Sequence, residues 1–293
     1  MTIIESALER AKSLKPERST GKAAHSSAPK AVAAPTRRAS DSAEAPQAQF
    51  QPHPVTVDPI FARENRLLMS SAVLEDRGAI AAYGMLRTRL LHRVRAEGWT
   101  TIGVTSAAPQ DGKSLTAVNL SLSLARERNS MVVLVDLDMR NPTVCRSLGI
   151  RPPVELRDFF EQKQRAAQDL FMSIGVDNLL VAGSITPSQN AAELLSSSRL
   201  EELLGFIKAS VTSPLILVDL PPLPSPEDAL VVAPRVDAML LVAAEGQTPI
   251  TELRKAFTLL EPFPVAGVVL NRSTDFGRHY AYGYGYGGDR GSD

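Results

Sequence analysis

The sequence of 293 residues contains a single cysteine, Cys145, so it cannot form an internal disulfide, and this scarcity fits a reducing compartment. We expect Cys145 to pack in the core. Aromatic residues make up only 5% of the chain, and 32 basic residues balance 32 acidic ones. This balance gives no sign of a nucleic-acid-binding surface, so no nucleic-acid partner is expected. The four histidines are scattered and show no metal-ligand spacing.

Long hydrophobic runs are also absent. No apolar run approaches the ~20 residues that span a bilayer, and the N-terminus lacks the pattern of a signal peptide. We therefore expect a cytoplasmic protein, for which any role at a membrane requires a partner.

The most informative feature that is present is a loop ending in Gly-Lys-Ser, Ala107-Ala-Pro-Gln-Asp-Gly-Lys-Ser114. It follows an apolar run, 101–105, and precedes a helical pattern, 115–124. A strand, such a loop and a helix form a phosphate site, because loop amides and the helix N-terminus face the phosphates. Lys113 is expected to reach the β- and γ-phosphates of ATP, and Ser114 to hold Mg²⁺. The expected nucleotide-lining residues are Gln110, Asp111, Gly112, Lys113, Ser114 and Leu115.

Two further apolar runs end in acidic residues. The run 131–135 precedes Asp136-Leu-Asp138-Met-Arg140, and the run 214–218 precedes Asp219-Leu-Pro-Pro222. Unbroken runs of this kind are typical of strands buried on both faces of a parallel sheet, and ligands bind beyond the carboxyl ends of such strands. We therefore expect the three motifs to converge on one ligand. The alternative is that each Asp only caps a turn.

From residue 101 onwards strand patterns alternate with helical patterns. This alternation predicts an α/β fold of the P-loop NTPase kind, with a mostly parallel sheet flanked by helices. Strands are also expected at 178–183, 238–244 and 265–270, and helices at 80–96, 190–209, 227–232 and 250–260.

Composition divides the chain into four parts. Residues 1–14 have apolar residues at helical spacing and are expected to form a short amphipathic helix that folds on a partner or membrane surface, or else a frayed tail. Residues 15–57 are rich in Ala, Ser, Pro and charge, which predicts a disordered linker. Residues 58–275 are the expected P-loop domain, and residues 276–293 a flexible tail rich in Gly and Tyr.

Together these motifs resemble the Walker A, Walker A′ and Walker B motifs of bacterial tyrosine kinases, the autokinases of capsule and exopolysaccharide export. The resemblance continues at 83–89, 190–197, 267–271 and in the tail. It implies an ATP- and Mg²⁺-dependent protein-tyrosine kinase that regulates polysaccharide polymerisation and export. It also implies a homo-oligomer, a transmembrane polysaccharide co-polymerase as partner, a cognate phosphotyrosine phosphatase, and a position at the inner face of the plasma membrane.

The resemblance further suggests roles for individual residues. Asp138 and Asp219 are expected to act at the metal together with Ser114. One of the two Walker A′ carboxylates would accept the proton of the incoming tyrosine, and Asp136 is our choice between them. The implied phospho-acceptors are Tyr280, Tyr282, Tyr284 and Tyr286.

Two other residues have alternative interpretations. Arg140 would contact phosphate or tether a loop, unless it forms only a surface salt bridge. Asn271 would recognise the adenine edge, by analogy with MinD/ParA-like ATPases, unless it only forms a turn.

The chain departs from the family pattern in two places. The family loop has Gly where Gln110 stands, so a left-handed backbone there would cost about 1–2 kcal/mol. The family's oligomer motif, Glu-x-x-Arg-x-x-Arg, aligns with Ala81, Gly84 and Arg87, so only its last residue is kept. The second departure leaves an alternative function open: a non-kinase ATPase switch or scaffold of the MinD/ParA type that docks to a membrane co-polymerase. The lack of an early Lys in the loop disfavours that alternative.

Overall fold

The computed structural model describes residues 50–69, 77–161, 164–223 and 226–273. The expected helix at 1–14, most of the expected linker and the tyrosine-rich tail lie outside these residues. The folded unit begins at Phe50. Residues 50–57, which we assigned to the linker, contain strand β1 (His53–Pro54), so that boundary was placed too late in the chain.

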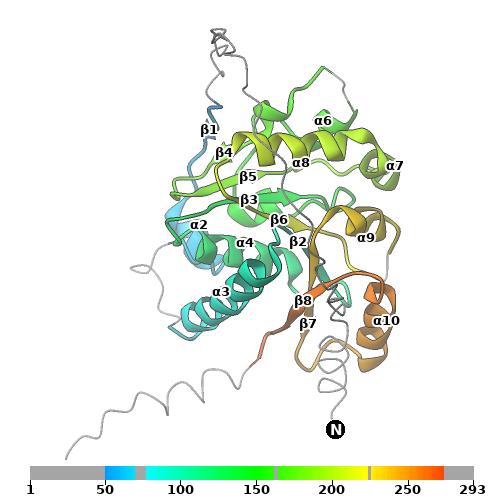
Figure 1. Ribbon diagram of the computed structural model, residues 1–293. Helices are drawn as coiled ribbons and strands as arrows, with labels where there is room; N and C mark the ends of the chain where they lie inside the picture. Colours follow the sequence, from blue (N-terminus) through cyan, green and yellow to red (C-terminus); the bar gives the residue numbers. More distant parts are fainter. Residues whose placement is uncertain (1–49, 70–76, 162–163, 224–225, 274–293) are drawn as a thin grey trace, which may run out of the picture. The chain divides into compact units, whose positions relative to one another are not determined.

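A sheet of eight strands forms the centre of the described residues (Figure 1). Neighbouring strands are parallel except for the antiparallel pair of β4 and β5. In spatial order the strands are β1, β4 (Met172–Ser173), β5 (Leu179–Ala182), β3 (Met131–Asp136), β6 (Pro214–Asp219), β2 (Thr101–Ser106), β7 (Ala238–Ala244) and β8 (Val265–Asn271).

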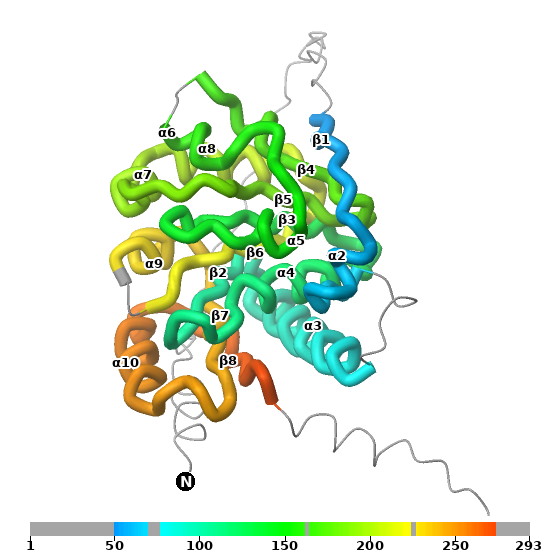
Figure 2. Tube along the Cα trace, turned by 180° about the vertical axis from the view of Figure 1, so that it is seen from behind, coloured from blue at the N-terminus to red at the C-terminus, as the bar shows by residue number. Residues whose placement is uncertain are grey.

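Helices cover both faces of the sheet (Figures 1 and 2). One face packs against α2 (Pro59–Glu64), α3 (Arg77–Glu97), α4 (Lys113–Leu124) and α5 (Val144–Leu148). The other packs against α6 (Leu156–Glu161), α7 (Ala191–Ser196), α8 (Ser198–Ser210), α9 (Pro226–Val232) and α10 (Ile250–Leu260), with 3₁₀ turns at Ala167–Leu170 and Ala233–Arg235.

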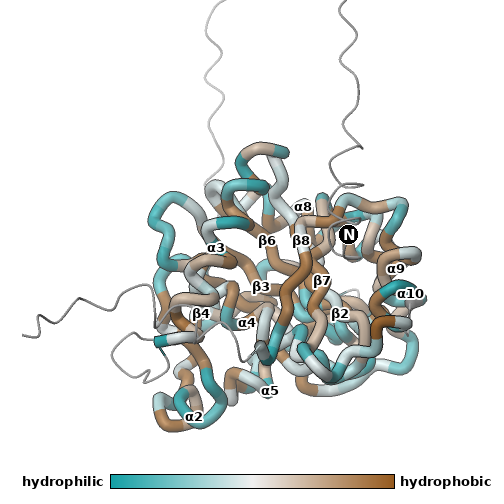
Figure 3. The backbone as a smooth tube through the Cα atoms, turned by 90° about the horizontal axis from the view of Figure 1, so that it is seen from below, coloured by the Kyte–Doolittle hydropathy of each residue, from teal (hydrophilic) through white to brown (hydrophobic). Residues whose placement is uncertain are grey.

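The unbroken apolar runs are explained by these two layers. Along β3, Val132 and Leu134 belong to the core under α4, whereas Val133 and Val135 belong to the opposite core. Successive strand side chains point to opposite faces, so a strand covered on both faces needs apolar residues throughout. Figure 3 shows β7 and β8 as hydrophobic segments too, although β8, at the edge of the sheet, leaves Val268 and Leu270 exposed.

The predicted α/β fold is confirmed, although the short elements β4, α5 and α6 were not expected from the sequence. The single helix expected at 190–209 is divided at Ser197, which is extended (φ −73°, ψ 162°) and whose hydroxyl accepts a hydrogen bond from the Arg199 amide. The helix α2 was not predicted. It begins after Asp58, whose carboxylate accepts hydrogen bonds from the amides of Ile60 and Phe61, at 2.7 and 3.2 Å. Among the described helices, none is long and apolar enough to cross a bilayer.

The strand order brings the three sequence motifs together. β3, β6 and β2 are consecutive in the sheet and parallel, so their carboxyl ends lie at one edge. Asp136 and Asp219 are direct partners in the register of β3 and β6. The loop that follows β2 leads into α4 beside them.

Candidate nucleotide-binding site

The loop between β2 and α4 has two residues in the left-handed region. Gly112 has φ 89°, and a Cβ built there would lie 2.2 Å from Asn271 Nδ2, so only glycine fits. Gln110 has φ 65°, as the comparison with the family loop suggested. For a residue with a side chain, this conformation costs about 1–2 kcal/mol. The loop is therefore a strained backbone that depends on its surroundings.

The side chain of Asp111 closes this loop on itself. Its Oδ2 accepts a hydrogen bond from the Ala108 amide at 2.8 Å, and its Oδ1 accepts one from Thr248 Oγ1 at 2.7 Å. Asp111 is buried. Its carboxylate is thus committed to the loop and to the segment after β7, which leaves its backbone as the part available for a ligand.

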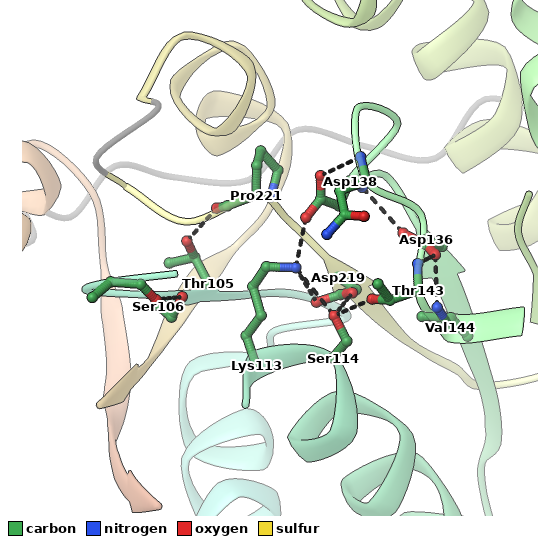
Figure 4. A network of polar contacts seen from close by, with 12 residues as sticks. Thr105, Ser106, Lys113, Ser114, Asp136, Asp138, Thr143, Val144, Asp219 and Pro221 are labelled. Carbon is green, nitrogen blue, oxygen red and sulfur yellow. Dashed lines mark hydrogen bonds and ion pairs between the residues drawn. The ribbon is translucent and has the colours of Figure 1, made fainter. Parts of the chain in front are cut away.

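The first helical residue, Lys113, extends across the three strand ends (Figure 4). Its Nζ lies 2.7 Å from Asp138 Oδ2 and 3.6 Å from Asp219 Oδ1, and it donates to Ser114 Oγ at 3.1 Å. Burial lowers the pKa of Lys113, but the charges of Asp219 and Asp138 outweigh this effect and leave the pKa raised. The side chain is therefore a firmly protonated cation.

Ser114 and Asp219 form a second pair within the cluster. Ser114 Oγ donates to Asp219 Oδ2 at 2.5 Å and accepts a hydrogen bond from Thr143 Oγ1 at 2.7 Å. Asp219 is completely buried, and its Oδ1 has no hydrogen-bond partner. Burial raises the pKa of Asp219 to about 6, although Lys113 opposes the shift. Asp219 Oδ1 is therefore a buried carboxylate oxygen without a hydrogen-bond donor, and it lies near the Ser114 hydroxyl. Such an oxygen is suited to bind a cation or to accept a hydrogen bond from a metal-bound water.

The two Walker A′ carboxylates have different environments. Asp136 Oδ2 accepts hydrogen bonds from the amides of Thr143 and Val144, both at 2.9 Å, and Oδ1 accepts one from the Asp138 amide at 3.2 Å. Burial, followed by the charge of Asp219, raises the pKa of Asp136 well above its usual range. Asp138 instead pairs with Lys113 and accepts a hydrogen bond from the Asn141 amide at 3.2 Å. Asp136 therefore organises the segment between β3 and α5, while Asp138 directly contacts the lysine.

Arg140 tethers its loop to α9. Its Nε and Nη2 donate to the two oxygens of Asp228 at 2.5 and 3.0 Å, and Nη1 donates to the Gln189 carbonyl at 3.3 Å. Asp228 is buried, so this bidentate pair is more than a surface contact. Of the interpretations considered, the described contacts favour the tether.

Asn271, at the end of β8, lies against the loop. Its Nδ2 donates to the Asp111 carbonyl at 2.8 Å, and its Oδ1 accepts a hydrogen bond from the Arg272 amide at 2.8 Å. Arg272 Nη2 donates in turn to the Gln110 carbonyl at 2.8 Å. Both groups of the Asn271 amide are thus engaged within the chain, and recognition of adenine by this residue stays a prediction.

Three residues of the site were missed in the sequence. Thr143 contacts Ser114 and Asp136, and its place shortly after the Asp-x-Asp-x-Arg motif could have suggested it. Thr248 and Arg272 carried no sequence signal, because they reach the phosphate loop from segments more than 130 residues away. The predicted acceptors, Tyr280, Tyr282, Tyr284 and Tyr286, lie outside the described residues.

The arrangement fits Mg²⁺ and a nucleotide. No group of three His, Cys, Asp or Glu side chains in the described part could alone hold a metal ion. Mg²⁺ commonly takes only one or two carboxylates and completes its shell with phosphates and waters. Ser114 with Asp219 and Asp138 can provide such a partial set, and the N-terminus of α4 favours phosphate.

Comparison with known proteins finds relatives that are named as tyrosine-protein kinases. No family model matches the chain. It is 30% identical over 210 residues to the tyrosine-protein kinase YwqD of Bacillus subtilis, covering 69% of this chain and 84% of YwqD. It is 28% identical over 229 residues to the putative tyrosine-protein kinase EpsB of Ralstonia solanacearum, covering 77% of this chain but only 30% of EpsB. The solved structure of the chimerical protein CapA2B2 has a TM-score of 0.60 and 25% identity, covering 65% of this chain and 83% of that one.

Proposed function

Because the chain belongs to the bacterial tyrosine-protein kinases, we propose that it transfers the γ-phosphoryl group of ATP to tyrosines of its own C-terminal tail and so regulates exopolysaccharide or capsule polymerisation and export. The observation that carries the proposal is the cluster of Lys113, Ser114, Asp138 and Asp219 at the joined ends of β2, β3 and β6.

Phosphoryl transfer requires positioning and charge stabilisation more than covalent work by the protein. In the proposed mechanism ATP supplies the phosphoryl group, and Mg²⁺ neutralises part of its charge. Lys113 and the loop amides hold the phosphates. Ser114 would hold the metal, with Asp138 and Asp219 as the carboxylates beside it. Arg140 keeps the Walker A′ segment in place through Asp228.

The proton of the substrate tyrosine is assigned to one of the two Walker A′ carboxylates. Burial raises the pKa of Asp136, and a raised pKa makes a carboxylate a stronger base than a free aspartate, which supports our choice. Oδ2 of Asp136 accepts two amides and Oδ1 only one, so Oδ1 keeps an acceptor position for the proton. Asp138 is the competing candidate, because it already lies against Lys113. The tail tyrosines Tyr280, Tyr282, Tyr284 and Tyr286 are the proposed acceptors.

The proposed partner is a transmembrane polysaccharide co-polymerase, which would hold the chain at the inner face of the plasma membrane. We also propose a homo-oligomer and a cognate phosphotyrosine phosphatase. The oligomer would not be built on the family's Glu-x-x-Arg-x-x-Arg motif, because Ala81 and Gly84 replace its first two residues. Arg87 itself donates within the chain to the Ser123 carbonyl at 3.1 Å.

The decisive experiment incubates the purified full chain with labelled ATP and Mg²⁺ and then detects phosphotyrosine. Label is expected on the wild type and not on a variant with all four tail tyrosines replaced by Phe. That variant should still bind ATP, which serves as the control for folding. ATP hydrolysis without phosphotyrosine in the wild type would favour the nucleotide switch of the MinD/ParA type instead.

A further inference from the structure

Two strained residues from distant parts of the chain meet at the phosphate loop. Gln110 in the loop has φ 65°, and Arg272 just after β8 has φ 59°. Both lie in the left-handed region, which side chains other than Gly rarely adopt. A hydrogen bond joins them, because Arg272 Nη2 donates to the backbone carbonyl of Gln110 at 2.8 Å.

Neighbouring contacts fix the position of Arg272. Its backbone amide donates to Asn271 Oδ1 at 2.8 Å, and its Nη1 donates to the side chain of Gln247 in the segment after β7. The Asn271 amide nitrogen donates to the carbonyl of Asp111, the next residue along the loop. Two consecutive loop carbonyls are therefore held by two consecutive residues at the end of β8.

The direction of these carbonyls affects the direction of the loop amides that would bind phosphate. A peptide group is planar, so a bond that fixes the Gln110 carbonyl also fixes the direction of the following amide. The amides here belong to the phosphate-facing loop. Gln110 has a Cβ and is free to leave the left-handed region unless something holds it, whereas a Gly at this position would tolerate the conformation without support.

We propose that Arg272, aided by Asn271, is a latch that holds the Gln110-containing phosphate loop in its nucleotide-binding shape. The inference rests on the proposed nucleotide site. It makes Arg272 a positioning residue, which sets nucleotide affinity through the loop backbone and not through contact with the base. The Gln at position 110 is what makes the latch necessary.

The first test measures affinity by calorimetry on the full chain with Arg272→Ala, using Mg-ATP and Mg-GTP. A latch predicts about tenfold weaker binding for both nucleotides, equivalent to about 1.4 kcal/mol. Arg254→Ala, which removes an exposed arginine of α10, is the matched control and should leave both affinities unchanged. A loss for ATP alone would mean that Arg272 contacts the base, and no loss would mean that the latch does not exist.

The second test removes the need for the latch. In a Gln110→Gly background the same Arg272→Ala change should weaken ATP binding by less than about threefold, because Gly holds the left-handed conformation unaided. An undiminished loss in that background would overturn the proposal.

The third test needs no nucleotide. Hydrogen exchange of the amides at 107–112 should be faster in Arg272→Ala than in wild type, and this difference should shrink with Gly at position 110. Unchanged exchange would contradict the latch. If the wild type bound no nucleotide at all, the proposed function would fail, while this measurement would still decide the latch.

Discussion

Lys113 Nζ lies 2.7 Å from Asp138 Oδ2, so the first residue of α4 is ion-paired with the segment after β3. Only 12% of the lysine side chain and 4% of the aspartate side chain are exposed. A second carboxylate, Asp219, lies 3.6 Å away. The positive charge of Lys113 thus neutralises buried carboxylates in the described structure. The same charge would bind the phosphates of ATP in the proposed function.

This pairing predicts two separate effects of Lys113→Met. Autophosphorylation and ATP binding should fall at least about 100-fold, because the phosphates lose their cation. The nucleotide-free protein should also lose about 1–3 kcal/mol of stability at neutral pH, because buried carboxylates lose their partner. Denaturant unfolding and calorimetry measure both effects. Lys113→Arg keeps the charge and should keep most of the stability. Full activity in Lys113→Met would refute the site.

Because the two Walker A′ carboxylates have different environments, their Asn variants should have different effects on phosphotyrosine formation and on ATP binding. If Asp136 is the base, Asp136→Asn should abolish phosphotyrosine formation while ATP binding stays within about threefold. Asp138→Asn should mainly weaken Mg-ATP binding, because Asp138 contacts Lys113. Single-turnover rates and equilibrium affinities separate the two roles. The reverse pattern would assign the proton to Asp138.

Gly112 should not tolerate any side chain. Gly112→Ala places a Cβ 2.2 Å from Asn271 Nδ2 at φ 89°, so the loop must shift. ATP affinity should fall by about 100-fold or more. The control is Gly205→Ala in α8, where nothing lies within 4 Å of the new Cβ. That change should leave ATP affinity intact and stabilise the helix by about 0.5–1 kcal/mol. Equal affinities for the two variants would show that the loop is more plastic than described.

The raised pKa of Asp219 predicts that the stability of the nucleotide-free protein depends on pH. Burial raises its folded pKa to about 6, above the unfolded value of about 3.9. Its contribution to stability is therefore complete below about pH 4 and is lost as the pH rises through about 6. Asp219→Asn removes this titration. In the absence of nucleotide its Tm should exceed that of wild type by about 3 °C at about pH 8, or about 1 kcal/mol, and the difference should vanish near pH 4. The exposed Asp177→Asn is the control; an Asp219→Asn gain independent of pH would be inconsistent with this cause.

Tail phosphorylation is expected to occur between subunits. The test mixes full-length Lys113→Met chain, which cannot transfer phosphate, with wild-type chain lacking residues 276–293, which has no acceptor. Phosphotyrosine should appear on the Lys113→Met chain, at Tyr280, Tyr282, Tyr284 or Tyr286. If the intact wild type is labelled but the mixture is not, transfer takes place within one chain. Each phosphate adds about −1.5 to −2 charges, so sedimentation should show that labelled tails weaken any oligomer.

Local patterns in the sequence determined the layered fold. The runs that became β3 and β6 are apolar on every position because each strand is covered on both faces, and that composition is visible without a structure. The phosphate loop could also be assigned from the sequence, because it is defined by consecutive residues, here Gly112, Lys113 and Ser114. Comparison with the family loop gave the left-handed conformation of Gln110 only as a condition, and the structure supplies its φ of 65°.

Only the tertiary structure decided which polar groups face each other. As far as the sequence was concerned, Arg140 could bind phosphate or tether a loop, and the structure shows the tethering contact, a bidentate pair with Asp228, 88 residues later. Thr248 and Arg272 reach the loop from the ends of β7 and β8, which lie near it because β7 pairs with β2. The break of the expected helix at Ser197 is a different case, because serine is a favoured residue at the start of a helix and Ser197 caps α8, so a local signal was present but was not used. Side-chain contacts between distant segments depend on strand order and register, and neither is encoded in any local pattern of residues.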